Sequence, residues 1–174
     1  MLRDERAQTD AKKDTLDLSA SYGFYFEGGI VSYVTYLNRN ETAQHDNAFY
    51  VEKEYDAAGR KVLVEAAFQY TDDIQGKEVS FANNIHTGEG GMHLTGFRTA
   101  LTRALNDYAR KNDYFKKEDE TLTGDDVREG ITAVISIKLA EPQFEGQTKA
   151  KLGSPEARTA VETVVGESLK EWLE

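Results

Sequence analysis

The stretch Asn83–Lys111, NNIHTGEGGMHLTGFRTALTRALNDYARK, decides the fold of this chain of 174 residues. It joins the end of a predicted strand to a glycine-rich turn, and the turn to the longest predicted helix. Apolar residues then recur at steps of three and four, as on one face of an amphipathic helix: Leu94, Phe97, Leu101, Ala104, Leu105 and Tyr108. Arg98, Arg103 and Arg110 lie off this stripe. Such a helix packs on a sheet, and its arginines either form a solvated face or serve a specific contact.

The segments around this stretch predict one mixed sheet. Two alternating segments flank the turn Asp56–Arg60 and are typical of a β-hairpin. The last predicted strand places five apolar residues on one face: Ile131, Ala133, Ile135, Ile137 and Leu139. Strands are expected at 2–6, 22–26, 49–55, 61–71, 77–83 and 131–139, and a short helix at 30–37. Together they predict a two-layer α/β sandwich of the α+β type, with helices on a mixed sheet.

The end of the chain predicts an irregular loop and a second long helix. Pro142 ends the preceding strand, and the loop 143–153 contains Gln147-Thr148-Lys149. Ser154-Pro155-Glu156 predicts a helix start, with a hydroxyl cap, a proline in the first turn and an acid near the positive end of the dipole. The expected buried stripe is Val161, Val164, Val165, Leu169 and Trp172. Because this stripe is still running at the last residue, the helix from about 154 is expected to be cut short there.

Composition limits the classes of function. The net charge of -10 argues against a surface that coats nucleic acid by charge alone, although local basic contacts within a larger assembly are compatible with it. No apolar run approaches the roughly 20 residues that span a membrane, and the N-terminus lacks the apolar centre of a signal peptide. The chain has no cysteine, and its three histidines lack a metal-ligand spacing. We therefore expect a cytoplasmic protein with no metal site and no membrane contact.

Two segments could contact a phosphate group. Gly88-Glu89-Gly90-Gly91 lies at a helix start, where backbone donors attract anions, but its spacing matches no nucleotide-binding fingerprint and Glu89 would repel phosphate. A structural turn is the favoured interpretation. Lys149 could present a compact charge to phosphate from its loop, with Gln147 as a neutral donor. The alternative is an ordinary exposed lysine. His93, just before the apolar stripe, is predicted to serve packing or hydrogen bonding.

These segments, taken together, resemble the second domain, the transducer domain, of the B subunit in the bacterial type IIA DNA topoisomerases, DNA gyrase and topoisomerase IV. The matching motifs follow one another over most of the chain: Glu27-Gly28-Gly29-Ile30, Tyr36-Leu37-Asn38, Asn83-Asn84-Ile85, Glu89-Gly90-Gly91, His93-Leu94, Gly96-Phe97-Arg98, Gly124-Asp125-Asp126-Val127-Arg128-Glu129-Gly130, Pro142 with Phe144, and Gln147-Thr148-Lys149. His86 and Met92 depart from the asparagine and threonine expected in this family.

The resemblance implies a fold with a left-handed βαβ crossover, also found in a small ribosomal-subunit protein, across residues 1–174. It implies that Gln147 and Lys149 bind nucleotide, with Lys149 as the catalytic contact to the γ-phosphate, and that Arg98 faces DNA. The partners implied are the ATPase and cleavage domains of the same polypeptide, both absent here, a second B subunit, the A subunit and DNA.

The whole subunit would be an ATP-hydrolysing DNA topoisomerase, an isomerase, that couples ATP use to DNA-strand passage. ATP with its Mg²⁺ would be bound mainly by the absent ATPase domain, so this chain alone is expected to be inactive and to carry no cofactor. The alternative is an independent acidic α/β binding module with the same fold and no catalytic role. The residues do not distinguish gyrase from topoisomerase IV.

Overall fold

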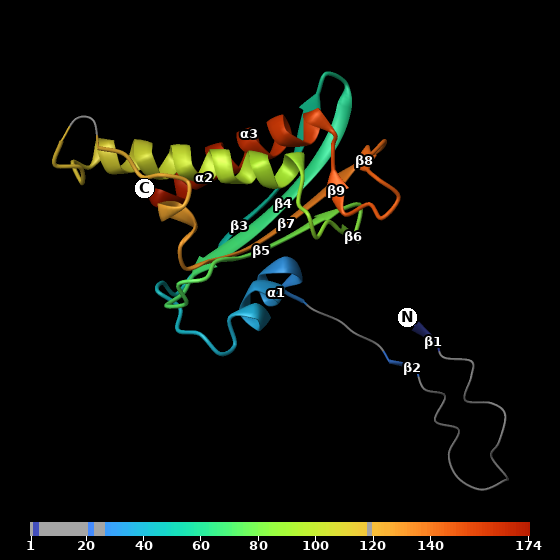
Figure 1. The fold of residues 1–174 in the computed structure, drawn as a ribbon, viewed down its shortest axis with the longest axis horizontal. Helices are drawn as coiled ribbons and strands as arrows, with labels where there is room; N and C mark the ends of the chain where they lie inside the picture. The colour runs from blue at the N-terminus through green and yellow to red at the C-terminus, as the bar shows by residue number, and fades with distance from the viewer. Residues whose placement is uncertain (1, 4–20, 23–26, 118–119) are drawn as a thin grey trace, which may run out of the picture.

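The computed structural model describes residues 2–3, 21–22, 27–117 and 120–174 (Figure 1). A five-stranded mixed sheet has the order β3-β4-β7-β5-β6. Its strands are β3 (Phe49–Ala57), β4 (Arg60–Tyr70), β5 (Lys77–Ala82), β6 (Ile85–His86) and β7 (Ile131–Leu139). The helices are α1 (Gly29–Leu37), α2 (Met92–Lys111) and α3 (Pro155–Leu173), with a 3₁₀ turn η2 at Asp126–Arg128.

The two strands expected near the N-terminus fall largely outside the described residues. What is described of them is a short antiparallel pair, β1 (Leu2–Arg3) with β2 (Ser21–Tyr22).

The hairpin of β3 and β4 is confirmed, and its turn is tighter than expected. Ala58 and Gly59 alone connect the strands, with φ values of 55° and 83°. Positive φ at both central residues suits the right-handed twist of paired strands. One face of the hairpin is buried, and on it the rings of Phe49 and Phe68 stack with 4.8 Å between their centroids.

The central strand β7 is more buried than its alternating pattern predicted. It pairs antiparallel with β4 and parallel with β5, and eight of its nine residues are buried. Ile135 belongs to the main core, whereas Val134 packs with Val34 of α1 on the opposite face. The predicted apolar face of this strand is therefore confirmed, since all five of its residues belong to the main core. The opposite face is buried as well, because α1 packs on it.

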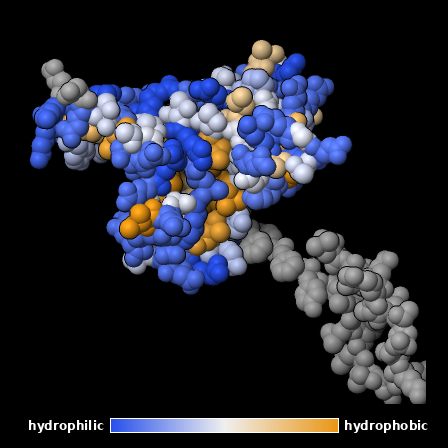
Figure 2. Space-filling model, in the orientation of Figure 1, coloured by the Kyte–Doolittle hydropathy of each residue, from blue (hydrophilic) through white to orange (hydrophobic). Residues whose placement is uncertain are grey.

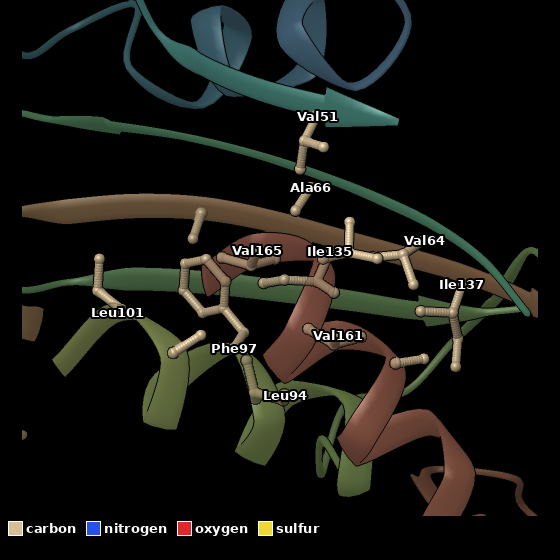
Figure 3. Packing of buried hydrophobic residues seen from close by; sticks show 14 of the residues in the cluster. Val51, Val64, Ala66, Leu94, Phe97, Leu101, Ile135, Ile137, Val161 and Val165 are labelled. Carbon is tan, nitrogen blue, oxygen red and sulfur yellow. The ribbon is translucent and has the colours of Figure 1, made fainter. Parts of the chain in front are cut away.

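The predicted fold class, helices on one mixed sheet, is confirmed. Helices α2 and α3 cover one face, and the parallel strands β5 and β7 are joined through α2 (Figure 1). Figure 3 shows Phe97 and Leu101 of α2 packed in one cluster with Val161 and Val165 of α3 and Ile135 of β7. The short helix α1 covers part of the other face, which adds a partial third layer to the expected two.

The segment 143–153, expected to be irregular, contains a small antiparallel hairpin of β8 (Phe144–Glu145) and β9 (Lys151–Leu152). Ser154 precedes α3 as predicted, but its side chain does not cap the helix. The buried Ser154 Oγ instead accepts a hydrogen bond from the Gln143 amide at 2.9 Å. The predicted hydroxyl cap was therefore wrong, because this hydroxyl joins the two ends of the hairpin segment.

The end of α3 packs on the sheet through Trp172. Its ring meets the rings of Phe49 and Phe68 edge-on, each at 5.9 Å between centroids, and the ring of His45 at 5.5 Å. Trp172 nevertheless keeps 40% of its surface exposed, so this contact closes the edge of the core.

Candidate functional site

The β8–β9 hairpin carries Gln147, Thr148 and Lys149 at its tip, and all three side chains are exposed. Lys149 has a φ of 54°, which is uncommon for a residue with a side chain. Its ammonium lies 5.9 Å from the centre of the Phe144 ring, within cation–π range. In the described part of the chain Lys149 has no acidic partner, whereas Lys151 pairs with Glu145 at 3.0 Å. The tip therefore presents an accessible cation on a hydrophilic surface (Figure 2).

The glycine-rich turn before α2 holds the base of this hairpin. The Leu152 amide donates to the Gly90 carbonyl at 3.0 Å, and the Glu89 amide donates to the Ala150 carbonyl at 2.9 Å. The Gly90 amide bonds within the turn, to the Thr87 carbonyl at 2.8 Å. Two amides that a phosphate could have used are thus occupied by the protein, which supports the structural interpretation of this turn.

Arg98 extends from α2 to Glu78 of β5. Its Nε lies 3.1 Å from both Glu78 carboxylate oxygens, and a terminal guanidinium nitrogen donates to Glu78 as well. The hydrogen bond to Glu78 raises the pKa of Arg98 above its ordinary value. The Glu78 side chain is 13% exposed and that of Arg98 is 43% exposed, so the pair is held in place while the cation still reaches solvent.

The structure brings Arg98 near the base of the hairpin but not to Lys149. A groove of about 650 Å³ is lined by Arg98, Glu78, Gly91 and Leu152 among others, and Lys149 is not part of its lining. The sequence-predicted site residues therefore occupy two neighbouring places, the hairpin tip and the groove beside its base.

The other two arginines of α2 have nearby acidic partners. Arg103 pairs with Glu162 of α3, and Arg110 lies 3.9 Å from Asp107 on its own helix. Both side chains are more than half exposed. These contacts are typical of a solvated helix face.

Glu78 is the site residue that sequence reasoning missed. Its only signal was an acid on the strand before the glycine-rich turn, and the pairing depends on how β5 lies against α2. Nothing in the spacing of Glu78 and Arg98 predicts that contact.

His93 is fully buried at the start of α2, which confirms its predicted role in packing and hydrogen bonding. Its Nε2 lies 3.1 Å from Thr87 Oγ1, and the same hydroxyl donates to the Ser80 carbonyl at 2.9 Å. Among the described residues, His93 Nδ1 has no hydrogen-bond partner. Burial lowers the pKa of His93 from 6.5 to about 4.

This buried histidine predicts a loss of stability in acid. Between the unfolded pKa of about 6.5 and the folded pKa of about 4, the unfolded chain binds a proton that the folded chain excludes. The free energy of unfolding should fall across this window by roughly 3 kcal/mol on account of His93. Urea unfolding between pH 7.5 and 4.5 measures it. In the His93→Gln variant, this decrease in the free energy of unfolding with falling pH should be absent. In His86→Gln, which replaces an exposed histidine, it should remain. Equal slopes in wild type and His93→Gln would contradict the assignment.

No group of three or more histidine, aspartate or glutamate side chains in the described ranges is placed to hold a metal ion. Within the same residues, no helix has the length and apolar character needed to cross a membrane.

The fold and the site define an α+β domain in which a glycine-rich turn joins a crossover helix to a lysine-bearing hairpin. A family model described as DNA gyrase B matches residues 29–174. The chain belongs to the DNA gyrase B family.

The similar proteins are longer than this chain. The DNA gyrase B subunit of Clostridium acetobutylicum is 49% identical over 166 residues, which cover 95% of this chain and 25% of that protein. The DNA gyrase B subunit of Bacillus mycoides is 52% identical over 150 residues, covering 86% and 36%. The crystal structure of the 43K ATPase domain of Thermus thermophilus gyrase B, in complex with an aminocoumarin, is 41% identical with a TM-score of 0.76, covering 84% of this chain and 38% of that one. The chain thus spans about a quarter to a third of the curated relatives.

Proposed function

We propose that residues 1–174 are the transducer domain of the B subunit of an ATP-dependent type II DNA topoisomerase, gyrase or topoisomerase IV. In this role the domain couples ATP binding and hydrolysis in a preceding ATPase domain to DNA-strand passage. The observation that carries the proposal is the Lys149 hairpin, an exposed cation on a tip whose base is bonded to the body of the domain. Membership of the DNA gyrase B family supports it.

The chain corresponds to only part of the Thermus thermophilus structure, which is described as an ATPase domain. The sequence contains no glutamate-asparagine-glycine ATPase motif. We therefore take ATP and its Mg²⁺ to be bound mainly by a region outside this chain. On its own the chain is expected neither to hydrolyse ATP nor to cut DNA.

Lys149 would supply positive charge to the γ-phosphate from outside that nucleotide site, with Gln147 as a neutral donor. Phosphoryl transfer is catalysed chiefly by positioning and charge stabilisation, so one added cation has a large effect. Lys149 would contact the γ-phosphate before hydrolysis and lose that partner afterwards. This difference in contacts between nucleotide states is what biases a domain rotation.

The wider assignments belong to the whole enzyme. Two B subunits would act as a dimer in the cytoplasm, together with the A subunit, and DNA would pass through the assembly. Arg98 would face that DNA from α2.

The DNA-facing role is tested by replacing Arg98 with glutamine in the full-length protein, assembled with the A subunit. The glutamine amide removes the positive charge but can still donate a hydrogen bond to Glu78, so the substitution should impair coupling more than folding. We expect strand passage per ATP hydrolysed to fall about five- to tenfold, with an unfolding midpoint near that of wild type. DNA supercoiling or decatenation and ATP turnover are measured on the same preparations.

Arg103→Gln is the matched control, because it removes an arginine from the same helix. It should keep the wild-type ratio of strand passage to ATP use. Normal coupling in Arg98→Gln would contradict the DNA-facing role and favour the independent binding module.

A further inference from the structure

We propose that Gly91 and Leu152 form a joint that makes the Lys149 hairpin and α2 move as one body. The two would then act as coupling residues between the hairpin and α2, without a part in ATP hydrolysis itself. The proposal rests on the proposed function, because it concerns how a nucleotide contact made by Lys149 is transmitted to Arg98.

The joint consists of backbone contacts inside the protein. The hydrogen bonds from Leu152 to Gly90 and from Glu89 to Ala150 tie the hairpin to the turn, next to one residue pair. That pair, Gly91 and Leu152, forms a parallel β-bridge. Leu152 is fully buried, so its bonds are shielded from competing water. The hairpin is therefore anchored firmly at its base while its tip stays exposed.

Gly91 makes this close approach feasible. Its φ of 136° and ψ of -162° lie in a region essentially limited to glycine. A Cβ atom at Gly91 would lie 2.5 Å from the Leu152 nitrogen and nearer still to the Leu152 carbonyl oxygen. Because both are backbone atoms, no side-chain rotation could relieve the clash. Any side chain at this position would push the hairpin away from α2.

The joint lies directly at the start of α2. Gly91 is the residue that precedes the first turn, and Arg98 lies about two turns further along. Helix α2 is also in close contact with α3, since a Cβ atom at Gly96 would lie 2.5 Å from the Arg158 carbonyl oxygen. A closely packed helix moved at its first turn carries its later turns with it. Displacement of Lys149 would thus be passed on to the Arg98–Glu78 pair instead of being absorbed by a loop.

The test is Gly91→Ala in the full-length protein, assembled with the A subunit. Lys149 keeps its covalent position on the hairpin, so ATP turnover should be retained. We expect strand passage per ATP hydrolysed to fall about tenfold or more, because the hairpin no longer moves α2. The ratio of the two rates is the readout, since a purely structural role would lower both together. Normal passage per ATP in a folded Gly91→Ala protein would overturn the joint.

Gly59→Ala is the control for backbone strain. Gly59 also has a positive φ, 83°, but a Cβ atom there would meet nothing within 4 Å. This variant should leave the ratio of strand passage to ATP use at the wild-type value. An equal loss of coupling in Gly59→Ala would overturn the joint, because strain alone would then explain the effect.

Failure of the joint and failure of the proposed function give different results. Unchanged ATP turnover in Lys149→Ala would overturn both, whereas reduced turnover in Lys149→Ala with normal coupling in Gly91→Ala would overturn the joint alone. If Gly91→Ala does not fold, hydrogen exchange of the unsubstituted chain tests the joint instead. The Leu152 and Glu89 amides should then exchange as slowly as the amides of β7. If they exchange as fast as the amides of residues 147–149, the joint is overturned.

Discussion

Replacing Lys149 by alanine is expected to lower ATP turnover by the full-length protein roughly 100- to 1,000-fold, the effect of removing one charge-stabilising donor from a reaction centre. The physical reason is the loss of a cation that would face the γ-phosphate as charge develops there. Steady-state ATP hydrolysis measures the effect. The fold should survive, because the Lys149 side chain is exposed and forms no ion pair within the described ranges.

Lys151→Ala provides the matched control for this prediction. Lys151 is on the same hairpin and has the same charge, but it pairs with Glu145 at the base. Turnover should stay near wild type in that variant. If Lys149→Ala and Lys151→Ala hydrolyse ATP equally well, the role assigned to Lys149 is wrong.

The Phe97→Ala substitution is expected to have the largest effect on stability. The Phe97 ring is fully buried and meets the Phe68 ring edge-on at 6.1 Å between centroids. Truncation removes apolar contacts and leaves a cavity between α2 and the sheet, which typically costs about 3–5 kcal/mol. Domains are stable by only roughly 5–15 kcal/mol in total, so a large share of the folded state would be lost.

Urea unfolding of the chain measures this change, with Ile74→Ala as the control. Ile74 is 76% exposed, and its truncation should alter the free energy of unfolding by less than about 0.5 kcal/mol. A similar small change in Phe97→Ala would contradict the position of Phe97 in the core.

The elements that the sequence predicted well are those with a long, regular apolar pattern. Helix α2 has buried Leu94, Phe97 and Leu101 at helical spacing, and the β3–β4 hairpin alternates over many residues. In both cases the period of the apolar pattern predicts which face of the element is buried. The partial layer formed by α1 could not be foreseen, since a short stripe does not specify which face of a sheet it covers.

The features that sequence reasoning missed depend on contacts between distant segments. Strands β8 and β9 have two residues each, too few to show any period. The Ser154 hydroxyl is typical of a helix cap, but the returning chain brings the Gln143 amide to it. Likewise, the Arg98–Glu78 pair joins residues 20 positions apart on different elements.

In the candidate site, too, some features follow from the structure and others from the family resemblance alone. The structure explains why Lys149 is accessible and why Gly91 must be glycine. The roles of Lys149 and Arg98 toward nucleotide and DNA came from resemblance to a family, because neither ligand leaves a periodic pattern in the residues. Those two roles stay predictions until the substitutions above are measured.

The packing of Trp172 provides an optical probe of one place in the molecule. The chain has a single tryptophan, and its indole lies where the end of α3 meets Phe49 and Phe68. Its emission therefore reports whether the last turn of α3 is docked on the sheet, without any added label. Detachment of that turn would expose the indole to water and shift its emission to longer wavelength, even while the rest of the sheet stays intact.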